Sequence, residues 1–173
     1  MTDPLDGRIG DAWAGEAPNG SHINLVLARR GSPTAAAALG ALASPRPGHI
    51  PLLACLKGAG TAIRPATIIA NKVTIETEEL ARITWGAAQL GIAQGVLDAV
   101  AEALLDAEEA GEVLVLVAVW VDPKAHDETA VRVAARAATR DAIADALGPP
   151  SADAVRALAA QREEAANAFY TGD

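Results

Sequence analysis

The apolar run over residues 112–121 constrains the fold of this chain more than any other segment. After Glu112 it reads Val-Leu-Val-Leu-Val-Ala-Val-Trp-Val, and such β-branched residues are typical of strands. Successive side chains of a strand point to opposite faces, so both faces of this strand are apolar. We therefore expect a central strand that other elements cover on both sides.

Short apolar segments and alanine-rich segments alternate on either side of this strand. Ser32 and Pro33 suit the N-cap and first position of one helix, and Ser151 suits the N-cap of another. The order predicts one α+β domain over residues 1–173, with a mixed sheet covered by helices and with 1–8 and 148–173 peripheral. The other expected strands are 9–13, 23–28, 51–56 and 66–70, with alternation continuing over 71–75, and the expected helices are 33–43, 78–105, 128–147 and 151–169.

Charge and cysteine content argue against several classes of function. A net charge of −8 disfavours nucleic acid as a partner, since phosphate binding needs a basic surface. Cys55 is the single cysteine, so no intrachain disulfide can form, and we expect its apolar run to bury it. The acidic N-terminus does not resemble a signal peptide, and no apolar run approaches the roughly 18 residues of a membrane span. We expect a cytoplasmic protein that does not contact membranes.

Several familiar motifs are missing from the sequence. It contains no Gly-x-Gly-x-x-Gly segment, no phosphate-binding loop and no nucleophile elbow. Its histidines, His22, His49 and His126, are far apart and lack the spacing of metal ligands. We expect no metal site.

His22 is the first candidate for chemistry, because it stands at the start of the apolar strand 23–28, just after a glycine-containing turn. Imidazole is the side chain whose ordinary pKa lies near neutrality, so it can give or take a proton under physiological conditions. A lone histidine at a strand start is more often an ordinary surface or capping residue. The other polar candidates decide between these two interpretations.

Four further polar residues could converge with His22 on an apolar wall. Asn24 shares a strand face with His22, and Lys72 and Thr74 share a face of another expected strand. Gln89 follows three small residues in a helix, and Trp85 stands four positions before it on the same helical face. Together these groups would suit a flat heterocycle with polar edges. Each residue taken alone also fits an ordinary structural role.

Three arginines recur at every fourth position of the expected helix 128–147, at Arg132, Arg136 and Arg140. This spacing places them in one row on the helix. The simplest interpretation is a solvated or subunit-facing stripe. A ligand-binding row is the alternative.

Five segments together resemble the formaldehyde-activating enzyme family over about residues 9–147. The most specific is Asn-Lys-Val-Thr-Ile at 71–75, and its spacing from His22 and Gln89 adds to it. The other segments are His-Ile-Asn-Leu at 22–25, Gly-Ser-Pro at 31–33, Leu-Leu-Ala at 52–54 and Trp-Gly-Ala-Ala-Gln at 85–89.

The resemblance implies an activity and a site. Members of the family condense formaldehyde with tetrahydromethanopterin to give the methylene adduct and water, as homopentamers with a fold similar to the second domain of ribosomal protein S5. No metal or redox cofactor is implied, because tetrahydromethanopterin is a co-substrate. His22 matches the family's proton donor, and the pterin-contacting positions match Asn24, Leu53, Lys72, Thr74 and Gln89.

The sequence departs from the family pattern at three places. Asn24 stands where the family has aspartate, so a negative charge near His22 is missing. Residues 57–60 and 129–132 also differ from the family's segments. We expect catalysis to suffer if the carboxylate matters, and restoring it with Asn24→Asp to raise turnover. The alternatives are a catalytically weakened paralogue that binds a pterin or one-carbon adduct, and a structural oligomer without a ligand.

Overall fold

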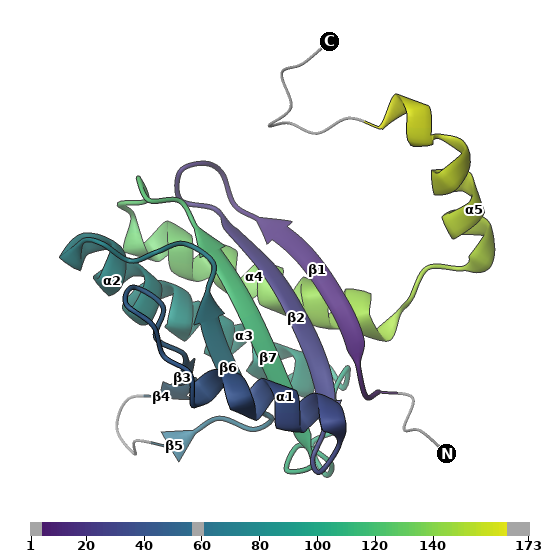
Figure 1. Cartoon of the computed structure of the whole chain (residues 1–173), viewed down its shortest axis with the longest axis horizontal. Helices are drawn as coiled ribbons and strands as arrows, with labels where there is room; N and C mark the ends of the chain where they lie inside the picture. The colour runs from purple at the N-terminus through teal and green to yellow at the C-terminus, as the bar shows by residue number, and fades with distance from the viewer. Residues whose placement is uncertain (1–4, 57–60, 166–173) are drawn as a thin grey trace.

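The computed structural model describes residues 5–56 and 61–165. It is an α+β protein built on a mixed sheet, in which the strand order is β1-β2-β7-β6-β3 (Figure 1). The described strands are β1 (Arg8–Ala14), β2 (Ser21–Arg29), β3 (Leu52–Leu53), β4 (Cys55–Leu56), β5 (Thr61–Ala62), β6 (Ala66–Asn71) and β7 (Val113–Val121). The α-helices are α1 (Pro33–Leu42), α2 (Glu78–Arg82), α3 (Gln89–Ala101), α4 (Glu128–Leu147) and α5 (Ala152–Ala160).

β7 is the central strand of this sheet, as the apolar run predicts. It pairs antiparallel with β2 and parallel with β6, so the sheet is mixed. Its alternate residues Val115, Val117 and Val119 are buried in the main core. The predicted α+β class with a mixed sheet is therefore confirmed.

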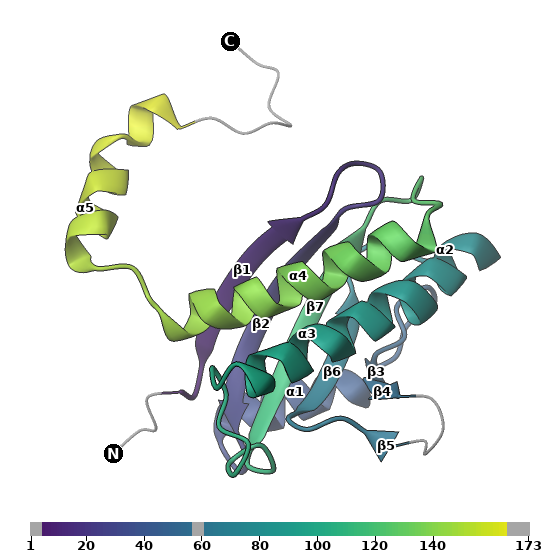
Figure 2. The ribbon, with the colours of Figure 1, turned by 180° about the vertical axis from the view of Figure 1, so that it is seen from behind.

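α3 and α4 cover one face of the sheet and lie side by side across it (Figure 2). The two helices approach closely because Gly91 and Gly95 of α3 present no side chain to the backbone of α4. Gly10 of β1 has the same role beneath α4, next to the carbonyl of Ala142. The alanine-rich composition suits this close spacing.

The opposite face is covered at one end only. There α1 packs through Ala35 and Ala38 on a small cluster of strand residues, which are Ala28, Ile68 and Leu114. The other end of this face, which carries His22 and Trp120, has no described helix over it (Figure 1). The expectation that β7 is covered on both sides therefore holds for one face and for part of the other.

The helices follow the sequence prediction at their starts more closely than at their ends. α1 begins at Pro33 with Ser32 as its N-cap, α4 spans the predicted 128–147, and Ser151 caps α5. The predicted single helix 78–105 is α2, then a π-helical turn over Ile83–Ala88, then α3, which ends at Ala101. α5 ends at Ala160, and Phe169 lies outside the described residues.

Two strand predictions were wrong. Segment 51–56 forms two short strands in separate sheets, so Cys55 lies at a sheet edge and is exposed rather than buried. Segment 71–75 does not continue as a strand, because the Asn71 amide donates to the carbonyls of Gly48 and Val73 and turns the chain away. Lys72 and Thr74 consequently do not share a strand face.

The two predicted peripheral segments behave differently. α5 carries no buried residue and extends away from the sheet (Figures 1 and 2). The carboxylate of Asp6, in contrast, accepts hydrogen bonds from the backbone N–H of Arg29 and from the hydroxyls of Ser32 and Thr34. These bonds lower the pKa of Asp6 and attach the chain before β1 to the start of α1. Within the described ranges, no helix has the length and apolarity that a bilayer crossing needs.

Candidate active site

The register of three strands gathers polar and aromatic side chains on the uncovered part of the sheet. His22 of β2 is paired with Trp13 of β1 on one side and with Trp120 of β7 on the other. Directly paired residues point to the same face, so the three side chains stand together. With Lys72 they line a pocket of about 440 Å³.

Both ring nitrogens of His22 have partners. Nε2 lies 2.7 Å from Oδ2 of Asp11, and Nδ1 lies 3.1 Å from Nζ of Lys72. A carboxylate only accepts hydrogen bonds and an ammonium only donates them, so Nε2 carries a proton and Nδ1 is the acceptor. The ring is about one-third exposed, which leaves it reachable from the pocket.

Asn24 joins the same group of contacts. Its amide Nδ2 donates to Oδ2 of Asp11, and its Oδ1 accepts from Nζ of Lys72 at 2.7 Å. His22, Asn24 and Lys72 of the sequence prediction are thus brought together, with Asp11 among them. Asp11 was missed as a site residue because it belongs to a different strand. Its alternation with Ile9 and Trp13 and the turn before His22 were the signals that could have found it.

Lys72 reaches this group from the end of β6. Its backbone N–H donates to the carbonyl of Val119 at 2.8 Å, which holds the residue beside β7 after the strand has ended. The side chain is exposed along much of its length, but its ammonium lies between His22 and Asn24. Partial burial lowers the pKa of Lys72 below its ordinary value, and the carboxylate of Asp11 opposes this shift.

The two tryptophans form an aromatic wall. Their ring centroids are 5.4 Å apart, and the Trp13 ring is 6.2 Å from the ring of His22. Trp13 is held by a hydrogen bond from Nε1 to the carbonyl of Gly15, and Gly20 leaves the room that its ring occupies. Trp13 is still 48% exposed, so a flat ligand can reach this wall.

Thr74 lies beside His49, a contact that the sequence did not predict. Nδ1 of His49 donates to the carbonyl of Asn71 at 3.0 Å, and the hydroxyl of Thr74 donates to Nε2 of the same ring at 2.9 Å. Because Gly48 has no side chain, the methyl group of Thr74 fits against the loop. Thr74 is thus positioned by the 46–49 loop rather than by a strand.

Leu53 and Gln89 lie at the far edge of the sheet from His22. Leu53 is on β3, opposite Ile68, and is 41% exposed on the same face as His22. Gln89 donates from Nε2 to the carbonyl of Cys55 at 3.1 Å. β3 is three strand spacings from β2, roughly 14 Å. Within one copy of the chain, these two residues are not beside His22.

Trp85 lies within the π-helical turn Ile83–Ala88, and Gln89 is the first residue of α3. Their shared helical face stays a prediction. Trp85 packs against the main core, while Gln89 turns to the backbone of β4.

The comparison with known proteins agrees with the sequence resemblance. A family model described as formaldehyde-activating enzyme (Fae) matches residues 9–170. The chain belongs to the formaldehyde-activating enzyme family. This match extends beyond residue 147, where the resemblance seen in the sequence ended.

Relatives of two lengths share this similarity. The chain is 38% identical over 150 residues to the 5,6,7,8-tetrahydromethanopterin hydro-lyase of Methanosarcina barkeri, which covers 86% of this chain and 84% of that protein. It is 34% identical to the bifunctional enzymes Fae/Hps of Methanothrix thermoacetophila and Archaeoglobus fulgidus, over 85% and 83% of this chain. It spans only 38% and 36% of the length of those two enzymes.

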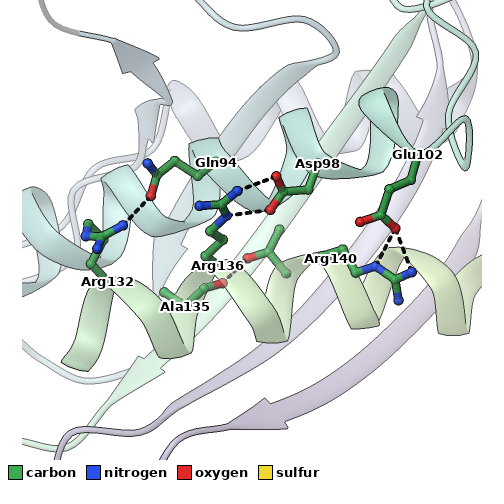
Figure 3. A network of polar contacts seen from close by, with 8 residues as sticks. Gln94, Asp98, Glu102, Arg132, Ala135, Arg136 and Arg140 are labelled. Atoms are coloured by element: carbon green, nitrogen blue, oxygen red, sulfur yellow. Dashed lines mark hydrogen bonds and ion pairs between the residues drawn. The ribbon is translucent and has the colours of Figure 1, made fainter. Parts of the chain in front are cut away.

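The arginine row of this Fae-family chain is bonded to side chains of α3. Arg132 donates to the amide oxygen of Gln94, and Arg136 and Arg140 each donate twice to one carboxylate (Figure 3). Those carboxylates belong to Asp98 and Glu102 of α3. The row therefore joins α4 to α3 while Arg136 and Arg140 stay partly exposed, which agrees with a solvated stripe. A subunit-facing or ligand-binding role of the row stays a prediction.

No group of three or more histidine, cysteine, aspartate or glutamate side chains that could hold a metal ion occurs within residues 5–56 and 61–165.

Proposed function

We propose that this chain condenses formaldehyde with tetrahydromethanopterin to give methylene-tetrahydromethanopterin and water. The observation that carries the proposal is an imidazole held between a carboxylate and an ammonium, beside an aromatic wall, in a member of the formaldehyde-activating enzyme family. The name of the hydro-lyase relative supports the same reaction.

The central requirement of this condensation is an acid that protonates the leaving hydroxyl. A ring nitrogen of the pterin adds to the carbon of formaldehyde and gives a carbinolamine. Its hydroxyl leaves as water when a proton reaches it, and the second nitrogen then closes the methylene bridge and releases a proton. In our proposal His22 delivers the first proton, a role typically worth about 10²–10⁴-fold in rate.

The remaining groups bind the pterin. Trp13 and Trp120 stack against the flat ring, because aromatic faces bind flat heterocycles well. Lys72 and Asn24 hydrogen-bond to its polar edge. We expect no metal or redox cofactor, since condensation with loss of water changes no oxidation state.

We further propose that the chain works as a homo-oligomer, a homopentamer by its resemblance to the family. Leu53, Thr74 and Gln89 would then contact the pterin that sits against His22 of a neighbouring copy. The exposed apolar residues Ile9 and Trp13, on the same sheet face as His22, support an interface there. The finer fold, similar to the second domain of ribosomal protein S5, the single domain over 1–173 and the cytoplasmic location remain part of this proposal.

The test measures the condensation of formaldehyde with tetrahydromethanopterin with and without the protein. We expect clear acceleration, and we expect His22→Gln to lose about 100-fold or more in kcat while the pterin still binds. Acceleration that survives this substitution would remove His22 from the mechanism. Tight pterin binding without acceleration would support the weakened paralogue, and neither binding nor acceleration would contradict the whole proposal.

A further inference from the structure

We propose that Asp11 of β1 is the positioning residue of His22 and supplies the carboxylate that Asn24 lacks. This inference rests on the proposed function. The departure at Asn24 predicts a weakened site when the sequence is considered alone. With Asp11 beside His22, Asn24 no longer implies that a carboxylate is missing from the site.

The negative charge that the family carries at position 24 of β2 is carried here by Asp11 of the neighbouring strand β1. Asp11 and Asn24 are directly paired in the register of β1 and β2, so their side chains stand on the same face beside His22. The backbone N–H of Asp11 donates to Oδ2 of Asp145 at 3.0 Å, which fixes this point of β1 to α4. A carboxylate on either strand can therefore reach the same imidazole.

The amide of Asn24 fits between Asp11 and Lys72, because it can bond to both. Oδ2 of Asp11 accepts from both His22 and Asn24, and Asn24 in turn accepts from Lys72. An amide can donate and accept at once, whereas an ionised carboxylate only accepts. With aspartate at both positions, two negative side chains would face each other and neither could donate to the other. Asn24 is thus the residue that fits beside Asp11.

Asp11 also decides which ring nitrogen of His22 can serve the reaction. It engages Nε2, so Nδ1 is the nitrogen that faces Lys72 and the pocket. When Lys72 turns to the pterin, Nδ1 is released and takes up a proton from water, which gives an imidazolium with Nε2–H still bonded to Asp11. Nδ1 can then pass that proton to the leaving hydroxyl, and the ring returns to its neutral Nε2–H form. The positioning of Nε2 keeps the ring in the orientation that this transfer needs.

The first arm of the test is a square of four proteins: the wild type, Asp11→Asn, Asn24→Asp and the double variant. We expect Asp11→Asn to lose about 10-fold or more in kcat with little change in KM, because orientation of the acid is lost. We expect Asn24→Asp not to exceed the wild type, and the double variant to recover most of the lost turnover. Asp153→Asn on α5 is the matched control, since it removes an exposed carboxylate far from the site.

Two results in this arm would overturn the proposal. One is full kcat in Asp11→Asn together with a gain in Asn24→Asp. The other is a double variant as slow as Asp11→Asn, which would show that the charge cannot be moved across the pair. Thermal midpoints of all four proteins separate loss of turnover from loss of folding.

The second arm does not depend on activity, so it keeps this inference separate from the proposed function. The chain has three histidines, and a ¹H–¹⁵N spectrum of the imidazoles, assigned with His22→Gln, reports the tautomer of each. Because the ammonium of Lys72 also favours a proton on Nε2, the comparison is made in Lys72→Met. We expect neutral His22 to carry its proton on Nε2 in the wild type and in Lys72→Met, and to populate both tautomers when Asp11→Asn is added to Lys72→Met, because an amide can donate or accept there. A proton on Nδ1 in the wild type, or the same tautomer in Lys72→Met with and without Asp11→Asn, would contradict the proposal even if the condensation assay succeeds.

Discussion

The two faces of the sheet differ in the size of the side chains they carry and in how closely other elements approach. On the covered face, glycines and alanines let α3 and α4 lie directly on each other and let α4 lie directly on β1. On the uncovered part of the other face, Trp13 and Trp120 stand beside His22 and leave a pocket. The first surface has no room for a methyl group, and the second has room for a ligand.

This difference teaches where the chain can carry chemistry. The covered face buries the residues of β2 and β7 that point to it, and the polar groups near it are joined in pairs between helices, as in the arginine row. On the other face, polar side chains share partners and remain within reach of solvent. Substitutions on the two faces should therefore change different measurements: stability on the first, turnover and binding on the second.

After the substitution of His22 itself, the largest effect is expected from removing the ammonium of Lys72 on the uncovered part of the sheet. Lys72→Met loses the donor to Nδ1 of His22 and to Asn24, so we expect kcat/KM for the condensation to fall by about 10–100-fold. Unfolding by denaturant should change little, because the side chain is exposed. Lys124→Met removes an exposed lysine after β7 and is the matched control. Equal activity of the two variants would exclude Lys72 from the site.

The pH profile sharpens the same prediction. Burial lowers the pKa of Lys72 from 10.5, so its ammonium is lost at a lower pH than that of an ordinary lysine. In wild-type protein, kcat/KM should therefore fall as the pH rises through a value below 10.5. Lys72→Met should lack this alkaline fall, and a fall of the same shape in the variant would assign it to another group.

The second effect belongs to the covered face. A Cβ at Gly91 would collide with the backbone carbonyl of Arg132, so Gly91→Ala should destabilise the fold by about 1–3 kcal/mol in denaturant unfolding. Gly86→Ala is the matched control, because nothing lies within 4 Å of its Cβ position. That variant should be neutral or slightly more stable. Similar losses in both variants would show that the close contact of Gly91 with α4 does not set the cost.

Much of the fold could be predicted from the sequence, because it depends on local patterns. The apolar run at Val113–Val121 predicted the central strand, and the caps Ser32 and Ser151 predicted two helix starts. The end of β6 could not be predicted in the same way. It depends on the Asn71 amide, whose partner Gly48 is far away in the sequence.

The candidate site was only partly predictable for a related reason. His22, Asn24 and Lys72 matched a family motif, so their meeting could be expected. Asp11 matched no motif that we recognised, and its contact with His22 arises from the register of β1 on β2. The sequence of β2 alone therefore lacks a carboxylate beside His22, whereas the paired strand β1 supplies one in Asp11.

The third prediction concerns the aromatic wall. Trp13→Ala removes one of the two tryptophan rings, whose centroids lie 5.4 Å apart, so a stacked pterin loses part of its contact area with the protein. We expect KM for the pterin to rise about 10-fold, with a smaller change in kcat. Trp85→Ala is the contrasting variant, since that side chain packs against the core. It should lower stability rather than pterin binding, and a kcat loss larger than the KM change in Trp13→Ala would place Trp13 with the proton transfer instead.

The smallest effect is expected from the ion pairs between the arginine row of α4 and the carboxylates of α3. Hydrogen bonds from Arg136 lower the pKa of Asp98 from 3.8, so the folded state favours the charged carboxylate. The resulting stability is fully present above pH 3.8, and it is lost as the pH falls through the lower pKa of the folded state. Asp98→Asn should therefore unfold more readily than wild type at neutral pH, and the difference should shrink as the pH falls below 3.8. Because both side chains are partly exposed, added salt should reduce the difference as well. A difference that is independent of pH and salt would mean that Asp98 acts through helix packing and not through its charge.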